Sequence, residues 1–356
     1  MSRIPFYPPS GVYSDSYRKD MRIVKTGKQR LMAIAGLVFL AALPFIPGLN
    51  APYHLRLLIG IGIAVIVALG LNILTGYCGQ LNVGQSAFMM VGAFTSGMLN
   101  AYWGWPFWAS VIPGGLAAAG VGVIFGIPSV RLKGLYLALT TLGAQIILTW
   151  IALYGVTVTS AGFTVEPVRL GGIVFNTPQK FYYVALAFTL GMALAAKNLM
   201  RSRLGRAFIA IRDNDRAAEG MGIDIFKYKL LAFAICTFYA GIGGALLVHY
   251  MMWAQLESFT LQDSVWYVAM IIVGGLGSIE GTIFGVIFIT VLKELVLVVG
   301  PMAQETLSFL PIGAASGMML VFIGSVAILF GVLEPRGMAH RWSLIKSFYR
   351  LWPFGY

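Results

Sequence analysis

The sequence is poor in the residues on which most enzymes and metal sites depend. Its three histidines lie far apart, and none has a carboxylate or second histidine at a metal-ligand spacing. Its two cysteines, Cys78 and Cys236, cannot build a disulfide framework, and we interpret both as packing residues. The sequence has no phosphate-binding GxxxxGK[ST] loop, because its Gly-Lys pair, Gly27 and Lys28, is followed by glutamine instead of the required serine or threonine. We therefore expect no catalytic residues, no metal site and no cofactor bound by this chain.

Charge is also scarce, whereas long apolar runs are abundant. Charged residues make up 11% of the 356 positions, far below the roughly 25% of soluble domains, and the mean hydropathy is +0.82. Continuous apolar runs of about 17 to 25 residues predict membrane-crossing helices rather than the alternating strands of a barrel. The sequence thus predicts an all-α, polytopic integral membrane protein with about ten transmembrane helices, some of them discontinuous. The predicted spans are 31–49, 57–75, 84–101, 107–127, 135–154, 181–197, 229–253, 264–276, 282–299 and 313–333.

The basic residues predict how these spans are oriented. The net charge of +12 would suit a nucleic-acid partner, but the distribution of the charge indicates a membrane instead. When the N-terminus is placed in the cytoplasm, 21 of the 25 lysines and arginines fall on the cytoplasmic side. We therefore predict cytoplasmic N- and C-termini, a location in the cell inner membrane, contact with the lipid bilayer and no nucleic-acid partner.

Three regions follow from the composition. Residues 1–30 form a cytoplasmic arm without apolar periodicity, and residues 31–333 form the transmembrane domain. In the tail, 334–356, aromatic side chains alternate with basic ones, which predicts an amphipathic segment. This tail either lies along the inner membrane surface or packs on the cytoplasmic side of the protein itself.

The most polar stretch between apolar runs is RSRLGRAFIAIRDNDRAAEGMGIDIFKYK, residues 201–229. Two short helices are predicted within it, at 207–211 and 216–221, and the Asp-Asn-Asp run at 213–215 offers N-cap oxygens for the second. Small Ala217 and Ala218 would allow a close approach by another protein, with arginines around them as polar contacts. The positive-inside rule accounts for the arginines, but it does not account for the Ala-Ala-Glu-Gly-Met-Gly run.

Two glycine-rich stretches interrupt predicted spans. The first, LNILTGYCGQLNVGQSAFMMVGAF at 71–94, combines glycines with uncharged polar residues, and the second is VGGLGSIEGTIFG at 273–285. Unwound backbone at membrane depth is tolerated where it is buried in protein or lines a watery path, so paired breaks predict a translocation path. With 43 glycines in the chain, close helix packing remains the alternative explanation. The candidate path residues are Asn72, Thr75, Gln80, Asn82, Gln85 and Ser86.

Few ionisable residues lie within the predicted spans. Lys293 and Glu294 are the clearest ionisable residues within a predicted span, and such residues are functional candidates by default. Adjacent positions on a helix point about 100° apart, so we favour a structural role with separate partners. The scarcity of buried acids argues against an ion-coupled carrier. A long polar connection at 156–180 is a candidate docking or gating element on the outer side.

Several of these motifs together resemble the permease subunits of ABC importers of the branched-chain amino acid, LivM-like family. The resemblance rests on GRAFIAIRDNDRAAEGMGID followed by YKLLAFAICTFYAGIGGAL, on both glycine-rich stretches, on GLYLALTTLGAQ from Gly134 and on ILFGVLEPRG ending at Gly337. These motifs cover most of residues 57–337. The arm before Arg30 and the tail after Gly337 lie outside them.

The resemblance implies a role for the polar loop. In that family the segment matching 201–224 is the coupling helix that sits in a groove of a cytoplasmic ATPase subunit. The residues expected to serve this coupling are Gly205, Arg206, Arg212, Asn214, Ala217, Ala218, Glu219 and Gly222.

The resemblance also implies the partners and the cargo. Two ABC ATPase subunits would bind ATP and magnesium, a homologous second permease would complete the path, and a periplasmic or extracellular solute-binding protein would deliver the solute. Branched-chain amino acids or related small polar organic solutes are the expected cargo. Urea, short amides or aromatic acids are alternatives, and a self-sufficient channel, an ion-coupled carrier or a membrane enzyme would be a different class of protein.

Overall fold

The computed structural model describes residues 27–46, 51–130, 132, 134–155, 162–170, 172–306, 317, 321, 324–326, 328–329, 331–332, 334 and 337–351. Most of the described chain is helical, as predicted. The α-helices of the described residues are α2 Gly27–Ala42, α3 Pro52–Asn72, α4 Gln85–Trp103, α5 Phe107–Val130, α6 Leu135–Trp150, α8 Pro178–Arg201, α9 Arg203–Asp213, α10 Asp215–Gly220, α11 Ile225–Met251, α12 Leu261–Gly274, α13 Ile279–Thr306 and α15 Gly337–Leu351.

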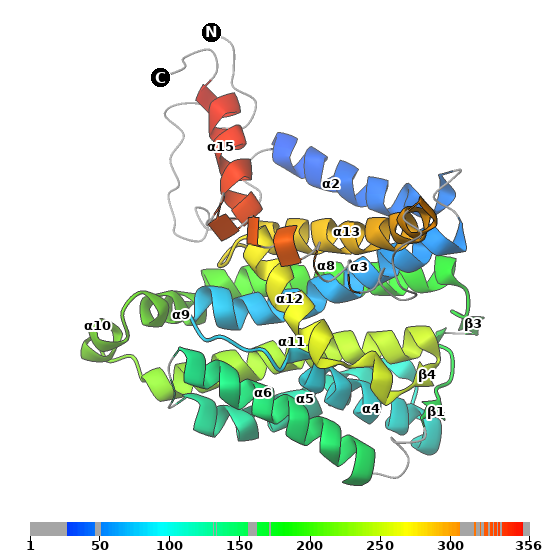
Figure 1. Cartoon of the computed structure of the whole chain (residues 1–356), viewed down its shortest axis with the longest axis horizontal. Helices are drawn as coiled ribbons and strands as arrows, with labels where there is room; N and C mark the ends of the chain where they lie inside the picture. The colour runs from blue at the N-terminus through cyan, green and yellow to red at the C-terminus, as the bar shows by residue number, and fades with distance from the viewer. Residues whose placement is uncertain are drawn as a thin grey trace.

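Four two-residue strands depart from the all-α prediction. β1 (Phe163–Thr164) pairs antiparallel with β4 (Trp253–Ala254), and β2 (Arg169–Leu170) pairs antiparallel with β3 (Ile173–Val174). All four lie at one end of the helix bundle, which we call the strand end, while α9 and α10 lie at the opposite, loop end (Figure 1). The predicted polar connection therefore forms a small paired structure rather than an irregular loop, although 156–161 and 171 lie outside the described residues.

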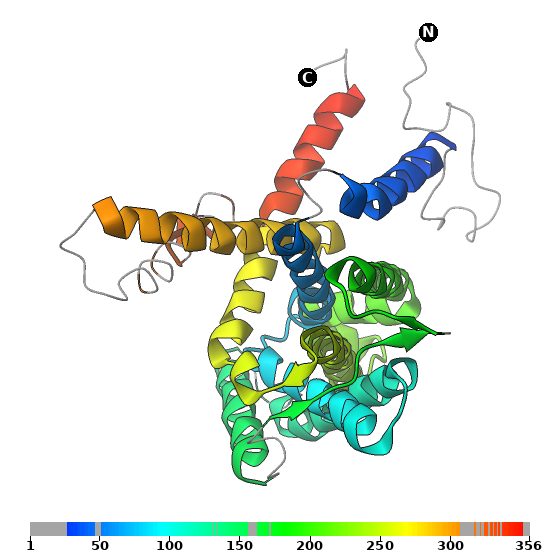
Figure 2. The ribbon, with the colours of Figure 1, turned by 90° about the vertical axis from the view of Figure 1, so that its right-hand side faces the viewer.

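Helix α11 occupies the centre of the bundle. It packs against α3, α4 and α5, and the view onto the strand end shows these helices arranged around it (Figure 2). The close approach depends on glycines: a Cβ placed on Gly92 of α4 would lie 2.2 Å from the Cα of Gly241. Likewise, a Cβ on Gly244 would lie 1.9 Å from the carbonyl oxygen of Met89. In a membrane the hydrophobic effect does not drive helices together, because lipid tails are as apolar as the side chains. Small residues compensate by allowing the helix backbones to come into contact.

Six of the predicted spans are confirmed by helices long and apolar enough to cross a membrane. Within the described residues these are Pro52–Tyr77, Phe107–Val130, Tyr136–Tyr154, Pro178–Arg201, Ile225–Met251 and Ile279–Val298. Helix α4 is 19 residues long and largely buried, whereas α12 has 14 residues and is too short to cross the roughly 30 Å hydrocarbon core alone.

The two remaining predicted spans lie at the ends of the domain. The first, predicted at 31–49, instead begins at Gly27, ends at Ala42 and continues as a short 3-10 turn to Phe45. The tenth, 313–333, falls largely outside the described residues, as does the arm before Gly27. Ten spans and the orientation of the termini therefore stay predictions.

The tail forms α15, which leaves the bundle at a steep angle (Figures 1 and 2). Its first two turns are anchored, because Gly337 lies against Gly275 and the Trp342 ring is 5.7 Å from that of Phe284 on α13. From Arg341 to Phe348 the side chains are exposed. Arg341 also pairs with Glu334, so within the described residues this helix is attached to its own chain near its start.

Replacing Gly92 by alanine should destabilise the bundle, because the added methyl group has no space against the Gly241 backbone. We expect a loss of about 1–3 kcal/mol, measured as a lower midpoint of thermal unfolding in detergent. Gly120→Ala on α5 is the matched control, since a Cβ at Gly120 meets nothing within 4 Å. Equal midpoints for the two variants would contradict the close-packing interpretation.

Candidate functional site

The polar loop is built from three consecutive N-caps. The Ser202 side chain accepts a hydrogen bond from the backbone of Leu204 to start α9, and the Asn214 side chain accepts one from Ala217 at 3.1 Å to start α10. The Asp224 side chain accepts one from the backbone of Lys227 at 3.0 Å to start α11. The hydrogen bond from the Lys227 side chain further lowers the pKa of Asp224. These caps confirm the predicted pair of short helices, and of the three N-cap candidates at 213–215 it is Asn214 that caps α10.

The tip of this loop presents only part of the expected surface. Ala217, Glu219 and Gly220 are exposed, and Met221, which the sequence analysis did not single out, is 82% exposed. Ala218, in contrast, is 2% exposed and packs in the core of its own chain. A partner that touches α10 would therefore contact Ala217 and Met221 rather than both alanines.

The glycines and arginines of the loop have different environments. Gly205 lies inside α9 rather than beside it, where a Cβ would be 2.3 Å from the Met200 carbonyl oxygen. Gly222 has φ +84° with open space around it, so it allows the turn that follows α10. Arg206 is exposed and donates to the carbonyl of Arg201 at 3.4 Å.

A buried ion pair ties the loop to the central helix. The Lys229 ammonium group on α11 lies 3.0 Å from the Asp215 carboxylate at the start of α10, and Lys229 is 6% exposed. Lys229 is buried whereas the Asp215 side chain is 21% exposed, so separating the pair would leave the buried lysine without its partner, which is unfavourable. The ion pair therefore holds α10 in a defined position against α11.

The two glycine-rich breaks lie side by side at the loop end. After Asn72 the first break continues as a π-helical turn, Ile73–Tyr77, and the second break separates α12 from α13. The Asn72 amide joins them, because it donates to Ser278 O at 3.0 Å and Thr282 Oγ1 at 2.7 Å and accepts from Gly277 N at 2.9 Å. Asn72 is 1% exposed. It therefore satisfies freed backbone groups of the second break.

Helix α4 begins inside the protein and is capped by other helices. Its N-cap residue is glycine and supplies no side chain. Instead, the backbone N–H of Ser86 donates to Ser264 Oγ at 2.8 Å, and that of Ala87 donates to Gln145 Oε1 at 2.9 Å. Thr141 Oγ1 accepts from Val83 N at 3.0 Å. Side chains of α6 and α12 thus complete the first turn of α4.

Asn82 and Gln85 form a closed hydrogen-bonded cluster rather than an open lining. Both are fully buried, and Asn82 Nδ2 donates to Gln85 Oε1 at 2.9 Å. Gln85 Nε2 also donates to Val67 O at 3.3 Å, and the Cys236 thiol donates to Gln85 Oε1 at 3.2 Å. In this conformation the two amides hold the first break against α3 and α11.

Among the described residues, the other three candidate path residues have unpaired side chains; they are Thr75, Gln80 and Ser86. In the described part of the chain, no partner is found for the buried polar atoms of these three side chains. Gln80 also lines a cavity of about 400 Å³ at the loop end. Arg212, Asp213, Asp215 and Lys229 line the same cavity. Of the six candidate path residues, Gln80 is thus the one that combines unpaired polar atoms with a cavity.

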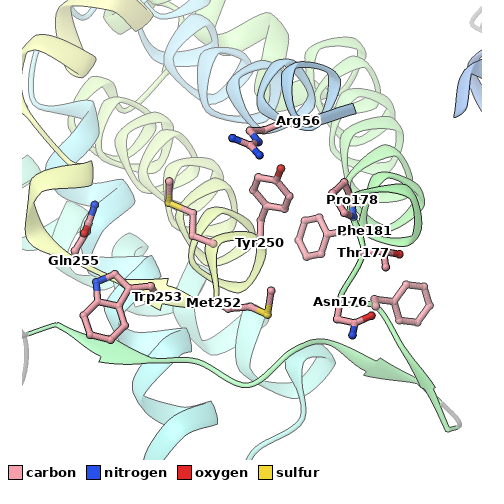
Figure 3. Close-up of a pocket in the computed structure, with 11 residues that line it drawn as sticks. Arg56, Asn176, Thr177, Pro178, Phe181, Tyr250, Met252, Trp253 and Gln255 are labelled. Carbon is pink, nitrogen blue, oxygen red and sulfur yellow. The ribbon is translucent and has the colours of Figure 1, made fainter. Parts of the chain in front are cut away.

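A second cavity of about 400 Å³ opens at the strand end, between α3, α8 and α11 (Figure 3). The Arg56 guanidinium group lies above the Tyr250 hydroxyl. Trp253, Phe181 and Met252 add apolar surface, and Met252 has φ +53°, the one non-glycine residue with positive φ in the described chain. A cation beside apolar walls can accept a small solute with a carboxylate and an aliphatic group.

Lys293 and Glu294 have separate partners, as the structural interpretation predicts. The Lys293 ammonium lies 5.1 Å from the centre of the Trp266 ring, and Glu294 accepts a hydrogen bond from the Tyr53 hydroxyl. The two charges therefore tie α13 to α12 and α3. Among the described residues, no group of three His, Cys, Asp or Glu side chains could hold a metal ion.

The sequence analysis did not identify the side chains that hydrogen-bond to residues far away along the chain. Gln145 and Ser264 cap α4 from 58 and 178 positions away, and Thr282 meets Asn72 from 210 positions away. The polar character of Gln145 within an apolar helix was a visible signal. Its partner could not be read from the sequence, because nothing local relates α6 to α4.

The apolar helices, the two broken segments and the capped polar loop define a multi-pass membrane protein of the transport class. The chain belongs to the family described as branched-chain amino acid transport system / permease component, whose profile matches residues 53–331. It is a permease subunit of the ABC transporter type, as its relatives are.

Individual relatives support this assignment. The high-affinity branched-chain amino acid transport system permease protein LivM of Escherichia coli is 31% identical over 76% of this chain and 69% of its own length. A probable branched-chain amino acid transport permease protein LivM of Methanocaldococcus jannaschii is 25% identical over 67% of this chain and 80% of its own. The guanosine ABC transporter permease protein NupQ of Bacillus subtilis is 25% identical over 51% of this chain and 62% of its own. No solved structure matches the chain.

Replacing Gln145 by leucine should destabilise the protein, because Ala87 N–H and the Ser264 hydroxyl both lose a buried acceptor. We expect a loss of about 1–3 kcal/mol in the unfolding free energy, measured by thermal unfolding in detergent. Thr140→Val on the exposed face of the same helix is the control, since Thr140 donates only to the carbonyl of Tyr136. An unchanged midpoint for Gln145→Leu would exclude the capping role.

Proposed function

We propose that this chain, together with a homologous second permease, forms the translocation path of a binding-protein-dependent ABC importer in the cell inner membrane. Two cytoplasmic ABC ATPase subunits bind ATP and magnesium and hydrolyse the nucleotide, while the chain itself carries no cofactor. A periplasmic or extracellular solute-binding protein delivers the solute. The observation that supports this proposal most directly is the capped α9–α10 loop, which exposes small and apolar side chains and yet is tied to the helix bundle by a buried ion pair.

The loop end faces the cytoplasm in this proposal. The positive-inside rule supports that assignment, since the arginines of α9 and α10 gather there. Exposed Ala217 and Met221 form the contact with the ATPase, a small residue beside a flexible apolar one. Arg206 and Glu219 supply polar contacts around them. Asn214 caps the start of α10, and Gly222 allows the turn that follows it.

The solute passes from the strand end to the loop end. The strand-end cavity, with Arg56 beside apolar walls, suits a solute that carries both a carboxylate and an aliphatic side chain. The loop-end cavity lined by Gln80 is the corresponding exit. Thr75 and Ser86 have unpaired polar atoms and belong to the path, whereas Asn72, Asn82 and Gln85 shape it by holding the broken segments.

The cargo we propose is a branched-chain amino acid or a related small polar organic solute. The relatives from Escherichia coli and Salmonella typhimurium, 31% and 30% identical, are named for branched-chain amino acid transport, which supports this class. The guanosine permease relative shows that the same family includes other solutes, so urea, short amides or aromatic acids remain the second candidate class.

Replacing Ala217 by tryptophan should impair ATPase docking, because the large ring occupies the surface where the partner approaches. In proteoliposomes containing the whole importer, we expect binding-protein-stimulated ATP hydrolysis to fall by about tenfold. Ala217→Ser keeps the small size and should behave as the unchanged chain does. Full stimulation of the tryptophan variant in an assembled complex would refute the docking assignment.

Uptake measurements should separate the two solute classes. Vesicles with the complete importer and its binding protein should accumulate labelled leucine, and unlabelled isoleucine and valine should compete with it. Urea and guanosine at the same concentrations should compete about tenfold less well or not at all, as expected for a site that discriminates by buried polar contacts. Preferential accumulation of urea or of an aromatic acid would replace the proposed cargo with the second class.

A further inference from the structure

We propose that Arg212 is the positioning residue through which the α9–α10 loop moves both broken segments of the path together. This inference rests on the proposed ATPase coupling, but it gives Arg212 a different task from the one expected from the sequence. Although Arg212 is exposed at the loop end, its guanidinium group reaches back to the Gly76 carbonyl in the helix bundle. The same group lies against both breaks.

The first contact is with the π-helical turn. Arg212 Nη1 donates to the Gly76 carbonyl oxygen at 2.5 Å, although the two residues are 136 positions apart. The carbonyl groups in the last turn of a helix lack partners within the helix and carry partial negative charge. A guanidinium group at this position therefore both pairs one of these carbonyls and interacts favourably with the end of α3 and its π-helical extension.

The backbone of α9 lies against the same break. A Cβ placed on Gly79 would lie 3.3 Å from Arg212 Cγ and 3.5 Å from its Cα. Gly79 has φ +74°, a left-handed conformation that favours glycine. The first break thus meets both the main chain and the side chain of Arg212, which makes the contact a broad one rather than a single hydrogen bond.

The second break closes around the same guanidinium group. A Cβ on Gly277, where φ is +77°, would lie 2.7 Å from Arg212 Nη1 and 3.2 Å from the Gly76 carbonyl oxygen. The two breaks are also joined directly by the Asn72 amide, which accepts from Gly277 N–H. The positive φ favours glycine at Gly277, and the two broken segments and α9 meet at this point.

This junction is placed to transmit motion. Arg212 is separated from the first residue of α10 by only Asp213 and Asn214, so a shift of α10 reaches it through three peptide units. The Asp215–Lys229 ion pair attaches α10 to α11 separately. An ATPase that moves α10 would thus act on the central helix through Asp215 and on both breaks through Arg212.

The test is the coupling ratio, the number of solute molecules taken up per ATP hydrolysed, in proteoliposomes with the complete importer. For Arg212→Gln we expect binding-protein-stimulated ATP hydrolysis to stay within about twofold of the unchanged complex while the coupling ratio falls by about tenfold, a typical strength of coupling between distant sites. Arg212→Lys keeps one donor for Gly76 but lacks the planar fork, so it should restore part of the ratio. Arg203→Gln, at the other end of α9, is the matched control and should leave both quantities unchanged.

Each outcome decides a different point. An unchanged coupling ratio in Arg212→Gln would overturn the inference while the proposed ATPase coupling stands. A parallel loss of hydrolysis and uptake in an assembled complex would also overturn it, because Arg212 would then belong to the ATPase contact. Should Arg212→Gln not assemble, the ratio of the lysine variant decides, and a value equal to the unchanged complex would refute the inference. If the unchanged complex shows no stimulated hydrolysis, the proposed function itself fails.

Discussion

The structure depends on the pairing of backbone groups freed where helices break inside an apolar environment. Lipid offers no hydrogen-bond partners, so each freed N–H and C=O group must be paired within the protein. Asn72 pairs groups at the second break, Gln145 and Ser264 complete the start of α4, and Arg212 pairs the Gly76 carbonyl. These four side chains come from four different helices. The breaks can therefore exist only when the whole bundle is assembled around them.

Close helix packing makes this pairing possible. The Asn72 side chain is short, so its amide can pair with the Gly277 N–H only where the backbones at Gly76 and Gly277 lie close together. At the centre of the bundle, α4 and α11 approach in the same way through Gly92, Gly241 and Gly244. The abundance of glycine thus serves helix packing at some positions and unwound backbone at others, while the translocation path predicted from the breaks stays a prediction.

The polar loop links this interior to a possible partner. Its tip is exposed, and yet Ala218 is buried and Asp215 pairs with Lys229 on the central helix. Every helix in this loop is capped, and both of its ends continue into long helices, so the loop has a defined structure rather than an irregular one. In the proposed importer, this defined structure would pass a displacement of α10 on to the two broken segments.

The sequence by itself determined the membrane class, the helical content, most span positions and the capped loop, because these follow from local composition, apolar run length and short-range capping. The Asn214 cap, for example, needs only three residues of context. Only the tertiary structure decided that Ala218 points inward, that Asn82 and Gln85 bond to each other within a packed cluster, and that Arg212 joins both breaks. The physical reason is that these contacts connect helices whose relative placement is set by glycine-mediated packing across the whole bundle, and no local pattern encodes which distant backbone a side chain will meet.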